Sequence, residues 1–575
     1  MSPERGQARM LAATAQVSSR KGTSVARIAR LGAAFVLGAS AALFVALTIH
    51  WPLIGDPAIQ QYAAFLATHG MAPYRQIADI NLPGSFLLDI AVIHTLGGGA
   101  LAWRVFDLLL LAAAALAMME IAQDWFAGLL AGVVFAAIHG ADGIFNLGQR
   151  DFVIAVLVVA GYAALFRATR RGAAGWVFAF GLCAGAAATI KPTFVILGPL
   201  VLLALGLSAR RQAPRWRGFA GWGVAGWLIP CLGALVYLVR ERAVSAFLRT
   251  MTGIAAYHAS LARQSFEFLL LHSVAPLGLL VVLWIAVEIP EMKTRVNWER
   301  LALLIGLACG LFSYVAQGKG YPYQRYPLLA LLLVAMVMDL VAAARKTGPM
   351  GAAGWVGVAY LVLVLAPCSV WRASRYDWRY TGMVAALDDD LSRLGGPSLS
   401  GQVQCIDTVG GCYNSLYDLR IVQHTGFLYD EFLFGPGGVR AIAAYRRAFW
   451  NSLVADPPRV VIVVEGLFPS GPHGFQKLKL WPEFDGFLAA HYVLYDEVTP
   501  ARATYWWARR DPPRSYRIYL LKQAPATGTG RAYSPVGRAV ARVSANSPRR
   551  AGRWGRMRQE NRRAWRAEQA RSAMG

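Results

Sequence analysis

Two carboxylates that could act as an acid or a base lie in one short polar stretch, residues 54–84 (IGDPAIQQYAAFLATHGMAPYRQIADINLPG). The stretch follows the first strongly apolar segment and precedes the second, which predicts that Asp56 and Asp79 lie beside a membrane. Tyr74 and Arg75 stand between the two acids. A single acid at a helix end is usually a cap or a solvated side chain. Two acids in one loop with an arginine and a tyrosine favour half of an active site instead.

Two further polar groups stand where apolar segments begin or end. In NLGQRDFV, Arg150 and Asp151 directly precede an apolar segment. Asp151 is either the N-cap of the helix that begins there or a functional acid, and the sequence favours neither. In ATIKPTF, Pro192 breaks the helix beside Lys191. This lysine either reaches back to the headgroups or binds a lipid phosphate or an active-site acid in a polar cavity.

A fourth polar group is the loop QGKGYPYQRYP, residues 317–327, which carries Lys319 and Arg325 among three tyrosines, Tyr323 at their centre. The two glycines let backbone amides approach an anion, and Arg325 could bind a phosphate through two hydrogen bonds. The alternative is an aromatic belt at the membrane interface with cations that reach the headgroups. We favour a site for an anionic headgroup, with tyrosines stacked on a sugar or a prenyl segment.

The four groups together suit one kind of reaction. A carboxylate can remove the proton of an incoming hydroxyl group, and cations can stabilise a departing lipid phosphate. The sequence has no P-loop and no GxGxxG after a strand. A site outside the membrane cannot use cytoplasmic sugar nucleotides, so a lipid-linked donor fits better.

The elements that must position these residues are membrane helices. Of the 575 residues, 56% are hydrophobic and only 15% are charged, whereas about a quarter are charged in a soluble domain. The apolar runs match the ~20 residues that span hydrocarbon. We therefore predict a mainly α, polytopic transmembrane bundle. Its twelve apolar segments lie near residues 31–50, 84–99, 103–121, 126–141, 152–167, 175–190, 193–208, 218–239, 266–288, 300–316, 328–344 and 352–370.

Charges beside these segments predict which loops face outward. Lys and Arg residues favour the cytoplasm, and the basic N-terminus and several later loops carry them. The regions placed outside are residues 54–84, 148–151, Lys191, residues 317–325 and everything after Trp371. Loops that alternate between the two sides of the membrane in this way require about eleven crossings, one fewer than the twelve apolar segments. One segment between residues 84 and 141 is therefore expected to be re-entrant or to lie along the interface.

Four parts are expected along the chain: a basic cytoplasmic tail (1–30), the transmembrane domain (31–370), a small extracytoplasmic α/β domain (371–523) and a basic, disordered tail (524–575). The α/β domain is predicted from strand-like and helix-like patterns. These are the strands VVIVVEG (460–466) and YRIYLL (516–521), and the helix and strand of FDGFLAAHYVLYDEV (484–498).

Most of the net charge of +25 is in the two tails, which together supply +15. Solvated, disordered tails are the simplest interpretation, and attraction to anionic headgroups is the sharper one. Nucleic-acid binding is not expected, because the basic tail has no folded reader motif.

Six cysteines are present, and only Cys405 and Cys412 lie in the polar C-terminal part. No CxxC pair occurs, which argues against a zinc site. In an oxidising compartment these two cysteines could form a disulfide, and the sequence leaves this open.

The motifs G-D-P-x-I-x-x-Y, H-G-x-x-P-Y-R and D-x-N-x-P-G in residues 54–84 resemble the first external loop of integral-membrane C-type glycosyltransferases. The closest branch is related to protein O-mannosyltransferases, lipid A aminoarabinose transferases and lipopolysaccharide galacturonosyltransferase-like proteins. The KPT turn, the loop K-G-x-x-Y-x-x-Y-P and the C-terminal α/β pattern resemble the same branch. The resemblance covers roughly residues 30–523.

This resemblance implies a hexosyl- or pentosyltransferase of the bacterial inner membrane. It would move a sugar from a polyprenyl-phosphate donor to an extracytoplasmic acceptor: a lipid, a polysaccharide or a protein of the cell envelope. Asp56 matches the family's essential first-loop acid, which sometimes acts with a divalent metal ion. Asp151 is similar to the acid of the second external loop, and Lys191 and Arg325 stand where contacts to the donor phosphate are expected. Pro57 replaces a second carboxylate of many relatives, and Asp79 is a candidate to compensate for it.

The expected site therefore has three catalytic acids and a larger set of substrate-binding side chains. The acids are Asp56, Asp79 and Asp151, and the binding residues are Tyr74, Arg75, Arg150, Lys191, Lys319, Tyr323 and Arg325. Two other functions are weighed. A transporter or flippase would place polar residues near the bilayer midplane in repeated, broken helices, and no repeat is evident. A non-catalytic envelope assembly protein would tolerate the loss of Asp56.

Overall fold

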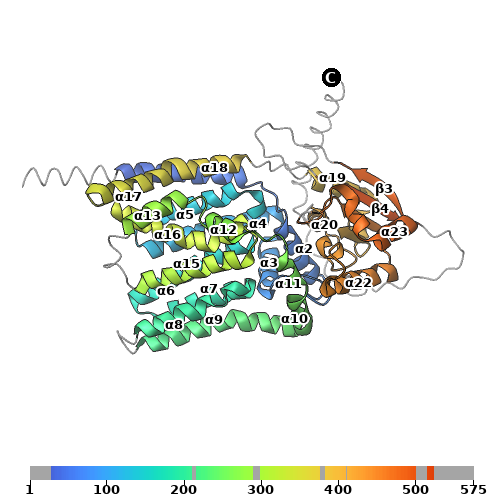
Figure 1. The fold of residues 1–575 in the computed structure, drawn as a ribbon, viewed down its shortest axis with the longest axis horizontal. Helices are drawn as coiled ribbons and strands as arrows, with labels where there is room; N and C mark the ends of the chain where they lie inside the picture. The colour runs from blue at the N-terminus through green and yellow to red at the C-terminus, as the bar shows by residue number, and fades with distance from the viewer. Residues whose placement is uncertain are drawn as a thin grey trace, which may run out of the picture. The chain divides into compact units, whose positions relative to one another are not determined.

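The fold is a helical bundle followed by a small α/β part, seen in a computed structural model (Figure 1). The structure describes residues 28–209, 215–288, 298–375, 382–408, 411–469, 471–499 and 514–522. Residues 1–27 of the predicted N-terminal tail and the predicted C-terminal tail lie outside the described residues. The predicted fold class, a polytopic helical bundle with a small C-terminal α/β domain, is confirmed.

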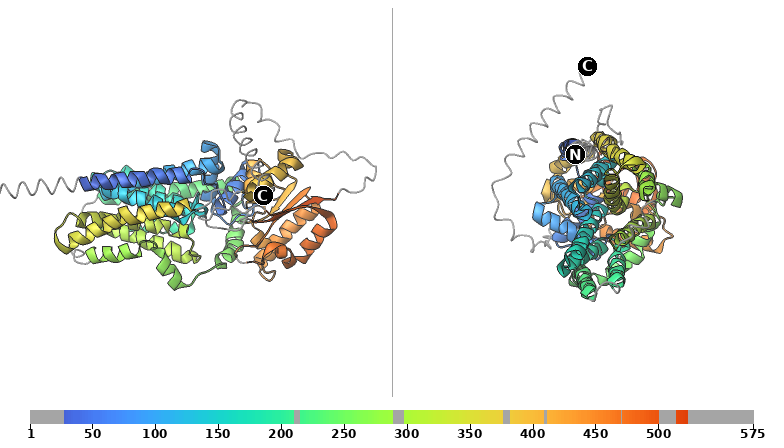
Figure 2. Two further views of the ribbon diagram at one scale, coloured as in Figure 1. Left: turned by 90° about the horizontal axis from the view of Figure 1, so that it is seen from above. Right: turned by 90° about the vertical axis from the view of Figure 1, so that its left-hand side faces the viewer.

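Among the described residues, eight helices are long and apolar enough to cross a membrane, and one bent pair would make a ninth. They run alongside one another, as the two views of Figure 2 show. The eight are Ile28–Thr48, α4 (Gly99–Ala122), α5 (Trp125–Asp142), α6 (Arg150–Arg171), Gly218–Arg240 within α9 (Arg215–Arg240), α15 (Trp298–Gln317), Pro322–Ala343 including α16 (Tyr326–Ala343), and Gly348–Ser374 with α17 (Gly348–Tyr360) and α18 (Ala366–Ser374). The bent pair is α12 (Phe266–Ser273) and α13 (Gly278–Glu288).

Two shorter apolar helices complete the path of the chain along the bundle. They are α7 (Ala174–Ile190) and the segment Pro192–Leu207, which contains most of α8 (Leu197–Ala209). The predicted number of about eleven crossings stays a prediction, because these two segments are shorter than the eight long helices. The other α-helices outside the α/β part, among the described residues, are α2 (Asp56–Thr68), α3 (Pro83–Leu96), α10 (Val244–Thr252) and α11 (Ile254–Ser260).

Helix α3, a third shorter apolar helix, lies at one end of the bundle. Its first turn packs closely on the end of α7, because a Cβ atom on Gly84 would lie 2.6 Å from the backbone of Thr189. Its last turn meets the α/β part, where the Tyr417 hydroxyl donates a hydrogen bond to the Gly97 carbonyl oxygen at 3.5 Å. Both ends of α3 therefore lie at the same end of the bundle.

Ion pairs mark the opposite end of the bundle. Arg170, in the last turn of α6, donates to the Glu299 carboxylate at 2.8 Å and to the Glu120 carbonyl oxygen at 2.8 Å. Arg345, after α16, pairs with Asp124, which caps α5. Because α6 begins at Arg150 and ends here, the predicted external loops and these arginines lie at different ends of the bundle.

The α/β part contains a four-stranded sheet in the order β1-β2-β4-β3. Strand β2 is buried along its whole length because its apolar run VVIVV packs on both faces, as expected for a central strand. It pairs in parallel with β1 and antiparallel with β4. The strands predicted from the sequence are confirmed. The bounds are β1 (Val403–Ile406), β2 (Val460–Val464), β3 (Tyr492–Val498) and β4 (Tyr516–Leu521), with α19 (Gly382–Leu394), α20 (Cys412–Asp418), α21 (Asp430–Leu433), α22 (Arg440–Ala455) and α23 (Pro482–His491) around them.

Residues 54–84 pack against the α/β part. The Tyr62 hydroxyl, buried in α2, donates to the Ile421 carbonyl oxygen at 2.9 Å and accepts from the Gln423 amide at 2.8 Å. The Ala78 amide donates to the Gly426 carbonyl oxygen at 2.9 Å. The loop that carries Asp56 and Asp79 is thus fixed between the bundle and this part.

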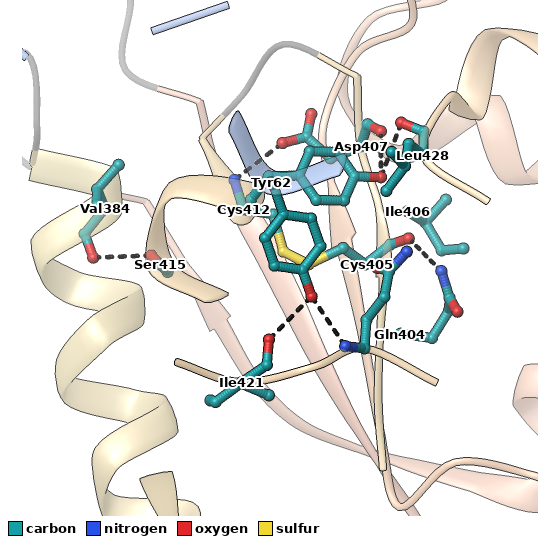
Figure 3. The surroundings of a disulfide bond; sticks show 12 residues. Tyr62, Val384, Gln404, Cys405, Ile406, Asp407, Cys412, Ser415, Ile421 and Leu428 are labelled. Atoms are coloured by element: carbon teal, nitrogen blue, oxygen red, sulfur yellow. Dashed lines mark hydrogen bonds between the residues drawn. A yellow bond between two sulfur atoms is a disulfide. The ribbon is translucent and has the colours of Figure 1, made fainter. Parts of the chain in front are cut away.

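A disulfide joins Cys405 in β1 to Cys412 at the start of α20, directly beside Tyr62 (Figure 3). We expect that replacing both cysteines with alanine lowers the free energy of unfolding by about 2–3 kcal/mol, because a short loop is no longer closed in the unfolded chain. Thermal unfolding of the purified chain with and without a reducing agent measures this. Equal stability of the variant and the oxidised wild type would contradict it.

Candidate active site

Asp56 begins helix α2 and faces a tyrosine of the fourth polar loop. Gly55, at a φ of +67°, turns the chain into the helix, and Pro57 occupies its first turn. The Tyr323 hydroxyl donates a hydrogen bond to the Asp56 carboxylate at 3.2 Å. The N-cap of α2 is Gly55, so Asp56 is the first residue of the helix and not its cap. Its carboxylate is therefore held by a side chain from residues 317–327, which lie far away in the sequence.

Lys191 and Asp151 form a close ion pair at the same end of the bundle. The ammonium nitrogen of Lys191 lies 2.6 Å from both carboxylate oxygens of Asp151 and 2.6 Å from the amide oxygen of Gln317. The N-cap of α6 is Gln149, so Asp151 does not cap that helix. Asp151 instead lies in its first turn, buried and directed toward Lys191.

These two groups lie within electrostatic reach of each other. The charge of Asp56 acts on Lys191, and Tyr323 experiences the charges of both Asp56 and Asp151. Two acids, a lysine and a tyrosine thus form one cluster. The acids come from the starts of α2 and α6, the lysine from a loop between two short apolar helices and the tyrosine from a tyrosine-rich turn. We name Asp56, Asp151, Lys191 and Tyr323 the central cluster.

Asp79 belongs to an adjoining, more buried group. Its carboxylate accepts hydrogen bonds from the Tyr429 hydroxyl at 3.0 Å and from the side-chain amide of Asn81 at 2.6 Å. Burial raises the pKa of Asp79, and the positive charge of Arg150 opposes that rise. Arg150 also donates to the Asn81 amide oxygen. The Asp79 carboxylate therefore orients Asn81, and through Asn81 the guanidinium of Arg150.

Tyr74 and Arg75 occupy very different environments. The Tyr74 hydroxyl is buried and donates to the Asn81 carbonyl oxygen at 2.5 Å, which ties it to the Asp79 group. The Arg75 guanidinium is exposed and donates to the Glu241 carbonyl oxygen at 3.3 Å. No contact of Arg75 with Asp56, Asp79 or Asp151 is seen among the described residues.

Lys319 heads a chain of three titratable side chains. Its ammonium nitrogen lies 2.5 Å from the His258 Nε2 atom, and His258 Nδ1 lies 2.7 Å from the Glu431 carboxylate. Burial lowers the pKa of Lys319 to about 8. Burial and the Lys319 charge lower the pKa of His258 to about 3. The imidazole is therefore neutral, with Nε2 accepting from Lys319 and Nδ1–H donating to Glu431.

Five residues of this region are not among those predicted from the sequence. They are Asn81, His258, Gln317, Tyr429 and Glu431. Tyr429 and Glu431 come from the α/β part and His258 from the short helix α11, so only the folded chain brings them near Asp56. Asn81 and Gln317 lie in loops that the sequence had already indicated, and Asn81 belongs to the motif D-x-N-x-P-G. The sequence offers no spacing signal for His258, Tyr429 and Glu431.

Arg325 contacts a different set of residues. Its guanidinium donates to both carboxylate oxygens of Asp142, at 2.9 and 3.1 Å, and to the His272 carbonyl oxygen at 3.2 Å. This buried pair fastens the start of α16 to the end of α5. The phosphate-binding role predicted for Arg325 remains a prediction, and the observed contacts favour a structural role.

The Arg325→Ala variant separates these two roles. We expect it to lower the free energy of unfolding by about 3–5 kcal/mol, because removing one partner leaves the other charge in a buried environment. Its affinity for undecaprenyl phosphate should change less than twofold. Differential scanning fluorimetry and lipid-binding titration in the same detergent measure both quantities. A large loss of lipid affinity at unchanged stability would support the phosphate role instead.

A divalent metal ion does not fit the side chains of this region. Among the residues that the structure describes, no three His, Cys, Asp or Glu side chains are grouped as metal ligands. Lys191 engages Asp151, while Tyr429 and Asn81 engage Asp79. Of the three predicted catalytic acids, Asp56 alone has neither a lysine nor an amide group bound to its carboxylate among the described residues.

A cavity of about 510 Å³ lies between α8 and α9. It is lined by Pro199, Leu202, Leu203, Gly206, Leu207, Ala220, Val224 and Trp227. None of these side chains titrates, so this cavity is not a candidate for the chemistry.

Comparison with solved structures identifies the fold. ArnT from Cupriavidus metallidurans in the apo state is 14% identical over 84% of this chain and 97% of that chain, with a TM-score of 0.52. The same protein bound to undecaprenyl phosphate gives the same identity and coverage with a TM-score of 0.50. The archaeal oligosaccharyltransferase AglB from Archaeoglobus fulgidus, in complex with an inhibitory peptide and a dolichol-phosphate, is 12% identical over 75% of this chain and 69% of that chain, with a TM-score of 0.44.

No protein-family model and no curated protein matches the sequence. The likeness to solved structures confirms the resemblance predicted from the motifs of residues 54–84. The chain has the fold of ArnT, a C-type glycosyltransferase.

Proposed function

We propose that the chain is a glycosyltransferase that moves a hexose or pentose from a polyprenyl-phosphate donor to an extracytoplasmic acceptor. The observation that carries this proposal is the central cluster. An acid held by a tyrosine lies beside a lysine at one end of a membrane bundle that has the ArnT fold. ArnT itself has been crystallised with undecaprenyl phosphate. A cation at the membrane boundary is suited to the phosphate of such a lipid.

In this reaction Asp56 acts as the general base. An acceptor hydroxyl attacks the anomeric carbon of the donor sugar, and its proton passes to the Asp56 carboxylate. The bond between the anomeric carbon and the phosphate oxygen breaks, and the polyprenyl phosphate leaves with both electrons of that bond. The Tyr323 hydroxyl orients the base through its 3.2 Å hydrogen bond.

The cations of the site stabilise the leaving phosphate. Lys191 can exchange part of its contact with Asp151 for a phosphate oxygen, and the buried Asp151 then keeps the ammonium group charged. Arg150 lies within electrostatic reach of both Lys191 and Tyr323, and Lys319 within reach of Lys191. Electrostatic stabilisation of this kind is usually the largest single contribution to catalysis.

We further propose that the site faces the outside of the bacterial inner membrane. The opposite end of the bundle carries Arg167, Arg170, Arg171 and Arg345, and loops rich in Lys and Arg stay in the cytoplasm. The disulfide of the α/β part suits an oxidising compartment. A lipid, polysaccharide or protein of the envelope is then the acceptor.

Cysteine labelling tests this orientation. In a background with its free cysteines replaced, a cysteine at the exposed Ser398 should react with a membrane-impermeant maleimide in intact cells. A cysteine at Thr347, exposed at the opposite end, should react only after lysis. Labelling of Thr347→Cys but not Ser398→Cys in intact cells would contradict the proposed orientation.

The activity is tested with the purified chain in liposomes. Undecaprenyl-phosphate sugars, each with one radiolabelled hexose or pentose, serve as donors. The acceptor is envelope glycan from a strain that lacks the gene. We expect one labelled sugar to pass to this glycan, and absence of transfer from every donor would contradict the proposal.

A further inference from the structure

Glu431 brings a third carboxylate toward the central cluster, and it comes from the α/β part. One carboxylate oxygen, Oε1, accepts from His258 at 2.7 Å. The other oxygen, Oε2, is buried and has no hydrogen-bond partner among the described residues. The residue as a whole is only 3% exposed. A buried acceptor without a partner is costly, and such groups are found where a ligand satisfies them.

The backbone that carries Glu431 is firmly held. The neighbouring Asp430 is buried and forms an ion pair with Lys477 at 2.5 Å, and Thr408 donates a hydrogen bond to it. Lys477 is itself buried and also donates to the Ile406 carbonyl oxygen at 3.3 Å. These contacts tie α21 to the sheet, so Glu431 is pre-positioned rather than free to turn away.

On the side of Glu431 that faces the membrane bundle, hydrogen bonds fix His258 and Lys319 in place. The neutral His258 donates from Nδ1 to Glu431 and accepts from Lys319 at Nε2. Lys319 belongs to the same loop as Tyr323, whose hydroxyl contacts Asp56. Burial, with the nearby charges of Asp430 and Asp56, raises the pKa of Glu431 well above its usual value. The negative charge of Asp56 also acts on Lys319 and His258. The free oxygen of Glu431 is therefore part of the region around the expected base.

We propose that the free Oε2 atom of Glu431 binds a hydroxyl group of the carbohydrate substrate beside Asp56. A carboxyl group has no positive charge to offer a phosphate, but it forms hydrogen bonds with sugar hydroxyls in either protonation state. The hydroxyl belongs either to the transferred sugar or to the acceptor. Glu431 is thus the contribution of the α/β part to substrate recognition, while Lys319 and His258 orient it. This inference rests on the proposed function.

The test compares Glu431→Gln and Glu431→Ala with the wild type in the liposome assay described above. The glutamine variant keeps the shape of the side chain and its reach toward His258. We expect kcat/KM to fall at least tenfold in both variants, with a higher KM for one substrate. A higher KM for the labelled donor assigns the hydroxyl to the transferred sugar, and a higher KM for the glycan assigns it to the acceptor.

Two controls separate recognition from folding. Glu483→Gln makes the same change at an exposed position of α23 and should transfer sugar like the wild type. The thermal midpoint and the affinity for undecaprenyl phosphate should stay unchanged in Glu431→Gln, because the phosphate does not touch this residue. Transfer within twofold of wild type in both Glu431 variants, while Asp56→Asn is inactive, would overturn this inference alone. Absence of transfer by the wild type would remove the proposed function and this inference together.

Discussion

Replacing Asp56 with asparagine is expected to reduce sugar transfer by about 10²–10⁴-fold, the usual contribution of a general base. The substitution keeps the size of the side chain and leaves an oxygen that can accept from the Tyr323 hydroxyl. It removes only the ability to take the acceptor proton. The measurement is the initial rate of transfer from a radiolabelled undecaprenyl-phosphate sugar by the purified chain in liposomes.

The matched control is Asp389→Asn, the same change at an exposed position of α19. This variant should transfer sugar at the wild-type rate. Asp56→Asn should also bind undecaprenyl phosphate as the wild type does, because the base does not contact the phosphate. A wild-type rate in Asp56→Asn would remove the catalytic assignment and would favour a transporter or an assembly protein.

Replacing Lys191 with methionine is expected to weaken undecaprenyl-phosphate binding by about 10- to 100-fold, since a hydrogen bond to a charged group contributes about 1.5–3 kcal/mol. Transfer should fall by at least as much. The same change also removes the partner of the buried Asp151, which costs about 3–5 kcal/mol of stability. We therefore expect Lys191→Met to lose both lipid affinity and stability, each for a different reason.

A double variant separates these two losses. Adding Asp151→Asn to Lys191→Met removes the buried charge and should recover most of the lost stability. Lipid binding should remain weak, because the phosphate still has no ammonium partner at this position. Thermal unfolding and lipid titration measure the two quantities in parallel. Recovery of lipid affinity together with stability would mean that Lys191 is only a structural partner of Asp151.

The sequence predicts the membrane helices and the strands well, because each is indicated by a pattern of neighbouring residues. Apolar runs of membrane-spanning length and strands such as VVIVV determine secondary structure from neighbouring residues alone. The segment near residues 84–99 is different, because its apolar pattern is the same whether or not it crosses. Only its contacts with Thr189 and Tyr417 place α3 at one end of the bundle.

The composition of the site is less predictable for a physical reason. Asp56, Asp151 and Lys191 each lie at the end of an apolar segment, where a polar residue stands out in the sequence. Glu431 and His258 lie in ordinary polar surroundings of the chain, and nothing nearby distinguishes them from solvated residues. For Arg325 the sequence signal is misleading in the other direction. Its tyrosine-rich loop suggests a ligand, while its guanidinium binds Asp142. Contacts with residues distant in sequence determine whether each of these side chains faces the site or a structural partner.

The central claim is that Asp56 and Lys191 lie at one site that receives a polyprenyl phosphate. An experimental structure of the wild-type chain in nanodiscs with undecaprenyl phosphate tests it most directly. We predict phosphate density in hydrogen-bond contact with the Lys191 ammonium group, at the end of the bundle where Tyr323 holds Asp56. Phosphate density elsewhere, with Lys191 still bound only to Asp151 and Gln317, would contradict the claim.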